Sequence, residues 1–112
     1  FNSSKPHPCD WRQPRESLEP VFPHADFSEM VNGPDSILGP GLVETAPHCD
    51  GRIDRLLTWL RKRPERSIAC VSHYGFLKRL FYKHFEPVGW RPPEGNGQWG
   101  NVEMRSVVVA FQ

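Results

Sequence analysis

A serine and a histidine stand directly after a short apolar run, where helical spacing begins. Ser72, His73, Tyr74 and Gly75 follow the run "IACV" at residues 68–71, and apolar side chains then recur every three to four positions. In an open α/β sheet, ligands lie where a strand ends and a helix starts, because unpaired backbone N–H groups point there. The pattern predicts a phosphate site. The competing interpretation is a histidine that only caps or packs the junction.

Each of these four residues has a role in the predicted site. His73 would be the catalytic residue, because an imidazole donates a hydrogen bond or carries positive charge beside a phosphate. Ser72 would cap the helix or donate to an oxyanion, and Gly75 would let the backbone approach closely. Tyr74, which stands between them, completes the predicted phosphate-binding turn.

A metal site is a second possibility, because the sequence contains several histidines and cysteines. The candidate ligands are spread along the chain as His7, Cys9, His48, Cys49, Cys70 and His73. Only Cys70-x-x-His73 has the short spacing of a structural zinc pair. We expect Cys70 to point into the core, where a small buried thiol is common, so we predict no metal and no cofactor.

Other charged and aromatic residues have simpler explanations. We expect the candidate carboxylates to be solvated, because they lie in polar segments: Glu16, Glu19, Glu29 and Glu44. The basic sequence Arg61, Lys62 and Arg63 would form a last helical turn, where the helix dipole favours cations; the chain's net charge of +1 argues against an anion patch. The four tryptophans would anchor loops, because no basic surface accompanies them.

The elements that would position His73 follow from hydrophobic spacing. Ile53, Leu56, Leu57 and Leu60 fall at i, i+3, i+4 and i+7, which predicts a helix over about 52–63 with Asp50 as N-cap and Pro64 as stop. The run at 67–72 predicts a strand buried on both faces. A second helix is predicted from Phe76 to Phe85, and a closing strand over 102–111.

Residues 1–51 have a different character. Prolines and glycines recur throughout, so only a turn or two of helix is expected, after Pro14 and before Pro20 and Pro23. We therefore predict one partial domain over 1–112, made of a loop-rich segment at 1–51 and a helix–strand–helix–loop–strand segment at 52–112. Residues 87–101 would be a further loop.

Composition sets the class of protein. The chain has 112 residues, 12 prolines, 9 glycines and 38% hydrophobic residues, which predicts a small core with much loop. The near-zero net charge gives no long-range field for nucleic acid. No apolar run approaches a membrane span. Three cysteines without a CxxC pair suit a reducing compartment, so we expect an intracellular location, in the cytoplasm or an organelle matrix.

The segment around His73 also resembles a known family. "IACVSHYGFL" at 68–77 resembles the second-histidine motif of the histidine phosphatase superfamily, the phosphoglycerate-mutase-like proteins. The weaker likenesses are "HPCDWR" with "FPHADFS", "RIDRLLTWLRKRPE" and "GNVEMRSVVV". The resemblance implies the C-terminal part of a three-layer α/β/α fold with a mainly parallel sheet. It also implies that His73 contacts the transferred phosphoryl group, and that no metal is needed.

The sequence departs from the family pattern in parts that matter for catalysis. The nucleophile of the family is a histidine in an Arg-His-Gly motif, and this motif does not occur in the 112 residues. The acid/base carboxylate would fall near Asn2, which cannot donate a proton as a carboxylic acid can. Tyr74 stands where the family usually has a glycine. What remains is half of a phosphate pocket.

Two functions follow from the resemblance and the departures. The first is an inactive domain fragment that serves as an accessory or structural component of a larger assembly. The second is the C-terminal half of an active phosphatase or mutase, with its phosphohistidine on a segment not present here. In both cases we expect another polypeptide to complete the sheet, as an N-terminal half or a neighbouring subunit, or to pack on Leu56, Leu60, Leu77 and Phe81. The expected ligand is a phosphorylated small molecule.

Overall fold

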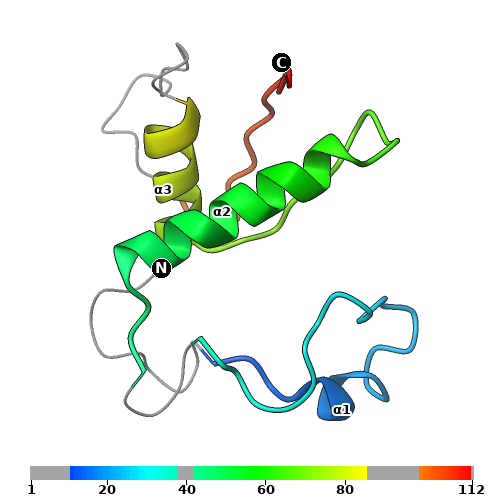
Figure 1. Ribbon diagram of the computed structural model, residues 1–112. Helices are drawn as coiled ribbons and strands as arrows, with labels where there is room; N and C mark the ends of the chain where they lie inside the picture. Colours follow the sequence, from blue (N-terminus) through cyan, green and yellow to red (C-terminus); the bar gives the residue numbers. More distant parts are fainter. Residues whose placement is uncertain (1–10, 38–41, 86–98, 112) are drawn as a thin grey trace. The chain divides into compact units, whose positions relative to one another are not determined.

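The structure is a computed structural model that describes residues 11–37, 42–85 and 99–111 (Figure 1). The described residues fall into two compact units, one that extends to Thr45 and one that begins at Ala46. The first ten residues of the predicted loop-rich segment, Asn2 among them, and residues 87–98 of the predicted loop at 87–101 lie outside the described residues.

Four helical elements are present in the described residues. They are α1 at Arg15–Leu18, α2 at Ala46–Arg61, α3 at Tyr74–Leu80 and the π-helix η2 at Phe81–Phe85. The single turn of α1 after Pro14 confirms the prediction for that segment. The end of α2, two residues before Arg63, fits the predicted stop at Pro64, because a proline disfavours helical backbone in the residue before it.

The predicted start of α2 is wrong by six residues. Asp50 is not an N-cap but lies inside the helix, which begins at Ala46. Pro47 fits a first turn, where its missing N–H has no partner to lose. The earlier start also buries Cys49 completely and brings Asp50 into an ion pair with α3, and these contacts outweigh the cost of Gly51 in a helix interior.

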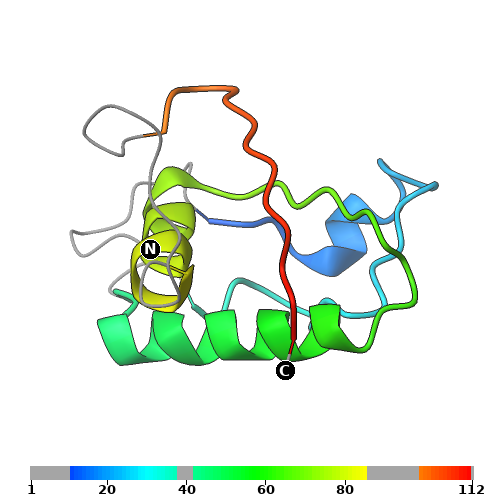
Figure 2. The same cartoon turned by 90° about the horizontal axis from the view of Figure 1, so that it is seen from above.

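The core lies where the first half of α2 meets α3 and η2, and the view from above shows α3 beside that half (Figure 2). Its buried members are Cys49, Ile53, Phe76, Leu80 and Phe81. The Phe81 ring meets Trp99 and Phe85 edge to face, with centroids 5.1 Å apart in both pairs. Full burial of an aliphatic side chain such as Ile53 contributes about 1.5–3 kcal/mol. The predicted apolar face of α2 is confirmed by Ile53, Leu56 and Leu57.

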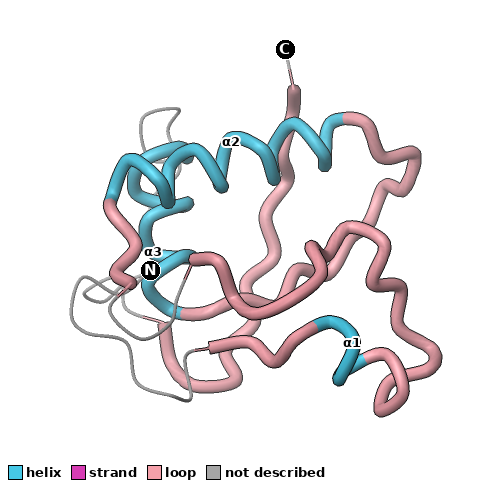
Figure 3. The backbone as a smooth tube through the Cα atoms, turned by 60° about the horizontal axis from the view of Figure 1, so that its bottom comes forward, coloured by secondary structure: helices cyan, strands magenta, loops and turns pink. Residues whose placement is uncertain are grey.

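The predicted α/β fold with a mainly parallel sheet is wrong. No β-strand occurs in residues 11–37, 42–85 or 99–111, where Leu42 is an isolated bridge (Figure 3). Both runs predicted as strands, 67–72 and 102–111, are rich in apolar or β-branched residues. A strand, however, exists only when its backbone groups pair with a neighbour. In the described backbone neither run forms ladder hydrogen bonds, and Val71 and Val108 are fully exposed rather than buried.

The first unit has no buried apolar side chain in residues 11–37 and is held by charged side chains on the backbone. Arg12 Nη1 and Nη2 donate to the carbonyl oxygens of Gly33 and Val31, each at 3.0 Å, and the Arg12 backbone N–H donates to Asp35 Oδ2 at 3.1 Å. Glu16 Oε1 accepts the Gly33 N–H at 3.0 Å. Gly33 has φ +82°, a left-handed conformation that favours glycine.

Candidate functional site

The start of α3 carries the four predicted site residues. His73 is the N-cap residue, with φ −95° and ψ 153°, and its carbonyl oxygen accepts the Leu77 N–H at 3.0 Å. The helix then begins at Tyr74. The predicted start of a helix directly after His73 is therefore correct, but the predicted strand before it is wrong, because residues 67–72 form an exposed loop.

The side chains at this junction face solvent. Ser72 and His73 are exposed, Tyr74 is 42% exposed and Gly75 is partly buried. The His73 side chain makes no capping hydrogen bond. Within the described residues, no ion pair to a carboxylate orients its ring. Lys78 Nζ lies 5.7 Å from the centroid of the Tyr74 ring, which places one cation a turn into the helix.

The core fixes the position of His73 through Phe76. The Phe76 side chain is buried beside Cys49 and Ile53 of α2, three residues after the histidine. The Arg52 guanidinium carbon lies 5.0 Å from the centroid of the Phe76 ring, a distance suited to a cation–π contact. The backbone from His73 to Phe76 therefore has a packed support on one side, while the imidazole and the Ser72 hydroxyl remain accessible to a ligand.

A second cluster of charges, which we did not predict, joins α2 to α3 and η2. The Asp50 carboxylate accepts hydrogen bonds from Arg79 Nε at 2.5 Å and Nη2 at 2.8 Å, and Lys83 Nζ also donates to it. The Arg79 and Lys83 hydrogen bonds hold the pKa of Asp50 well below its usual range. Arg79 and Lys83 therefore hold α3 and η2 against α2. The spacing of Arg79 and Lys83 at i and i+4 is the signal that could have indicated a shared acidic partner.

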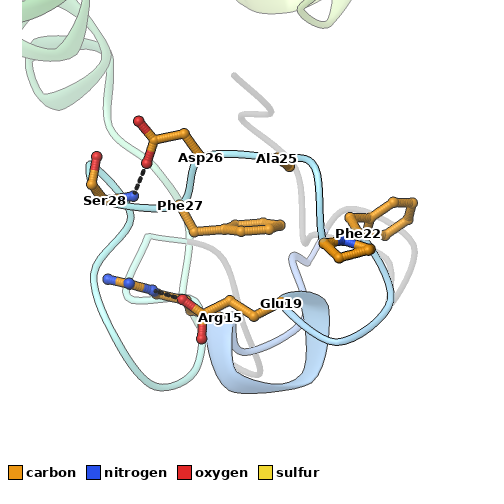
Figure 4. Close-up of a pocket in the computed structure, with 8 residues that line it drawn as sticks. Arg15, Glu19, Phe22, Ala25, Asp26, Phe27 and Ser28 are labelled. Carbon is orange, nitrogen blue, oxygen red and sulfur yellow. Dashed lines mark hydrogen bonds and ion pairs between the residues drawn. The ribbon is translucent and has the colours of Figure 1, made fainter.

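A hollow of about 310 Å³ lies in the first unit, around α1 (Figure 4). The Phe27 ring points into it above Arg15 and Glu19, which form an ion pair of 2.6 Å. The Asp26 carboxylate accepts the Ser28 N–H at 2.8 Å, and this bond lowers the pKa of Asp26. Arg15 and Glu19 bind each other and Asp26 binds the backbone, so each charged group of the hollow already has a partner.

The other predicted candidates have mixed outcomes. Glu19 is exposed, as expected for a solvated carboxylate, but Glu44 is 3% exposed, so that prediction is wrong for it. Cys70 is exposed, whereas we predicted it in the core, because the run around it is not a buried strand. The described residues contain no group of three or more His, Cys, Asp or Glu side chains placed to hold a metal ion.

In the part of the chain that the structure describes, no helix combines the length and the apolar character needed to cross a bilayer.

Three curated relatives of this chain are all described as phosphoglycerate mutase-like. The chain is 34% identical to phosphoglycerate mutase-like protein 1 of Arabidopsis thaliana over 104 residues, which cover 92% of this chain and 37% of that protein. It is 35% identical over 74 residues to the phosphoglycerate mutase-like protein, and 35% over 71 residues to phosphoglycerate mutase-like protein 2, of the same plant. These matches cover 66% and 63% of this chain, and 27% and 21% of the relatives.

Two other comparisons found nothing: no family model matches the chain, and no solved structure matches it. The chain thus spans little more than a third, at most, of the length of the curated relatives it matches.

Proposed function

Because the chain belongs to the phosphoglycerate mutase-like proteins, we propose that it supplies one part of a phosphate-binding site and has no phosphatase or mutase activity by itself. His73 contacts the phosphoryl group of a phosphorylated small molecule, with Ser72, Tyr74 and Gly75 beside it. One observation supports this role most: the core holds the start of α3 in place while the His73 side chain stays exposed, without a capping bond.

Inactivity of the isolated chain follows from the chemistry of a phosphohistidine. A covalent intermediate needs a nucleophile activated and positioned beside the phosphate. The chain has five histidines and no Arg-His-Gly motif. His84 lies beside Asp54 of α2, with Nδ1 3.7 Å from Asp54 Oδ1. Within the described residues, His73 makes no side-chain hydrogen bond, ion pair or ring contact with another histidine.

A second polypeptide segment is the partner that this proposal requires. The runs at 67–72 and 102–111 expose apolar side chains, among them Val71, Val102, Met104 and Val108, each more than 85% exposed. Exposed apolar side chains in such number mark surfaces that another chain covers. The partner covers these runs and brings the remaining residues of the phosphate site, so that the chain acts as a component of a larger assembly.

The alternative function is the C-terminal half of an active phosphatase or mutase, whose nucleophile lies on a segment outside these 112 residues. The exposed Ser72–His73 pair favours it, because a purely structural component has no need of an accessible imidazole. The two functions differ in whether the completed assembly turns over a phosphomonoester.

The experiment combines turnover with phosphate binding. We expect residues 1–112 to hydrolyse p-nitrophenyl phosphate no faster than buffer does. Inorganic phosphate should shift the ring resonances of His73 more than those of His24, an exposed histidine in the other unit that serves as internal control. Equal shifts of both rings would reject the phosphate role. Turnover that copurifies with the chain and is lost in His73→Ala would reject inactivity.

A further inference from the structure

The chain's net charge of +1 is the sum of two regions with net charges of opposite sign. Residues 46–112 contain 11 Lys and Arg against 6 Asp and Glu, a net charge of +5, whereas residues 1–45 contain 3 against 7, a net charge of −4. The boundary coincides with the division between the two compact units. The low overall charge is therefore no argument against a basic surface on the second unit, although it led us to assign Arg61, Lys62 and Arg63 to the helix dipole alone.

The exposed face of α2 carries that basic surface as a short stripe. Arg55 and Trp59 stand at i and i+4 on one side of the helix, and Lys62 follows in the turn directly after Arg61, where its N–H donates to the Trp59 carbonyl oxygen at 3.1 Å; all three are exposed. Trp59 is 39% exposed. The Arg63 guanidinium carbon lies 4.9 Å from the centroid of the Trp59 ring and adds a cation to the same surface. We call these four residues the α2 stripe.

Folding of α2 does not require the stripe. The helix buries its opposite side, with Ile53, Leu56 and Leu57. In the described part of the chain, Arg55 and Lys62 form no ion pair, whereas Arg63 pairs with Glu65 at 2.5 Å. A tryptophan on the solvent side of a helix, between two cations without carboxylate partners, is typical of a binding surface, where Trp and Arg are enriched.

We propose that the α2 stripe binds an acidic segment of another polypeptide, with two carboxylates about 10 Å apart on either side of an apolar side chain. This spacing matches seven residues at the helical rise, about 10 Å, from Arg55 in α2 to Lys62 in the turn that follows it. The carboxylates pair with Arg55 and Lys62, and the apolar side chain covers the Trp59 ring. The surface is separate from the proposed phosphate site and does not depend on it.

A protein segment fits the stripe better than a nucleic acid does. Tight binding of a phosphate backbone needs an extended array of cations, about 6 or more phosphate contacts. The stripe offers Arg55 and Lys62 as cations without ion pairs, and the Asp54 carboxylate stands beside them in the shallow depression around Thr58 and Trp59. A negative charge at that place repels a continuous phosphate chain more than it repels two spaced carboxylates.

Fluorescence anisotropy on the full 112-residue chain tests the proposal. The probes are a labelled peptide of sequence Glu-Glu-Leu-Leu-Glu-Glu and a labelled single-stranded oligonucleotide of equal length in nucleotides, both at physiological salt. We expect the peptide to bind, and Arg55→Glu with Lys62→Glu to weaken binding about tenfold or more. Trp59→Ala should weaken it about threefold or more. The matched control, Arg61→Glu with Arg66→Glu, changes the net charge equally off the stripe and should stay within about twofold.

Three results would overturn the proposal. They are the absence of peptide binding, an equal loss in the stripe and control variants, and tighter binding of the oligonucleotide than of the peptide. Circular dichroism checks that each variant keeps the helicity of the parent chain. If the double variant fails to fold, Trp59→Ala and the single variant Lys62→Glu provide the same comparison.

Discussion

In residues 46–85 the chain is held mainly by contacts between apolar side chains, whereas in residues 11–37 it is held mainly by charged side chains that bind the backbone. Cys49 and Ile53 are completely buried in the first case, and Arg12 donates to two carbonyl oxygens 19 and 21 residues away in the second. In residues 46–85 the core follows from the hydrophobic periodicity of the helices. In residues 11–37 the structure depends on single charged residues, each of which makes several hydrogen bonds.

The comparison predicts that a core substitution has the largest effect. Ile53→Ala leaves a cavity under Phe76 and Leu80, and such substitutions cost about 2–5 kcal/mol. We expect the free energy of unfolding, measured by urea denaturation of the helical signal, to fall by that amount. Thr58→Ala, at an exposed position of the same helix, is the control and should change it by less than about 0.5 kcal/mol. Equal effects of the two variants would mean that the helix pair has no packed core.

Acidification should weaken the same helix pair, but less than loss of the core does. The hydrogen bonds from Arg79 and Lys83 depress the pKa of Asp50 from its ordinary 3.8. A carboxyl whose pKa is lower in the folded chain than in the unfolded chain stabilises the fold at pH values above its unfolded-state pKa. This stabilisation is lost as the pH falls toward its folded-state pKa. Helicity should therefore decrease below about pH 4.

The control for this pH dependence is a pair of amide substitutions on α2. Asp50→Asn removes the ion pairs with Arg79 and Lys83, so it should lower stability at pH 7 and flatten the profile. Asp54→Asn, whose side chain is 67% exposed, should keep the profile of the parent chain. Parallel profiles for Asp50→Asn and the parent chain would show that another carboxyl is responsible.

Arg12→Ala should affect the other region by a smaller amount. Its hydrogen bonds to Val31 and Gly33 close the turn, so we expect a local loss of about 1–2 kcal/mol, seen as faster amide exchange in residues 31–37. Arg12→Lys should not restore protection, because an ammonium lacks the fork of donors that reaches both carbonyl oxygens. Unchanged exchange in both variants would show that the turn is held by other groups.

Two glycine substitutions give the smallest effects, and we expect them to differ in sign. Gly33→Ala forces a side chain into the left-handed region at φ +82° and should cost about 1 kcal/mol. Gly51→Ala lies in α2, where an added Cβ meets its nearest neighbour, Arg55 Nη1, at an ordinary 3.7 Å. It should stabilise the chain by about 0.5–1 kcal/mol. The same sign at both positions in thermal unfolding would contradict the assigned backbone conformations.

The sequence predicted local features better than pairings. Helical spacing identified α2 and its apolar face, and the position of His73 identified the start of α3. The sheet was wrong because the β-branched residues of 102–111 indicate only a preference for extended backbone, and a strand also needs a partner. Arg12, Asp50 and Arg79 were missed because their partners lie 19–33 positions away. Hydrophobic periodicity carries no information about such contacts.

The central claim is that these residues form an incomplete part that another polypeptide completes. Amide exchange of residues 1–112, read residue by residue on a sample whose mass is measured by sedimentation, tests this claim most directly. We expect slow exchange in α2 and α3, and exchange at nearly unprotected rates in residues 67–72 and 104–111, where the described backbone shows no hydrogen-bonded pairing. A monomer in which both runs are protected as strongly as α2 would contradict the claim.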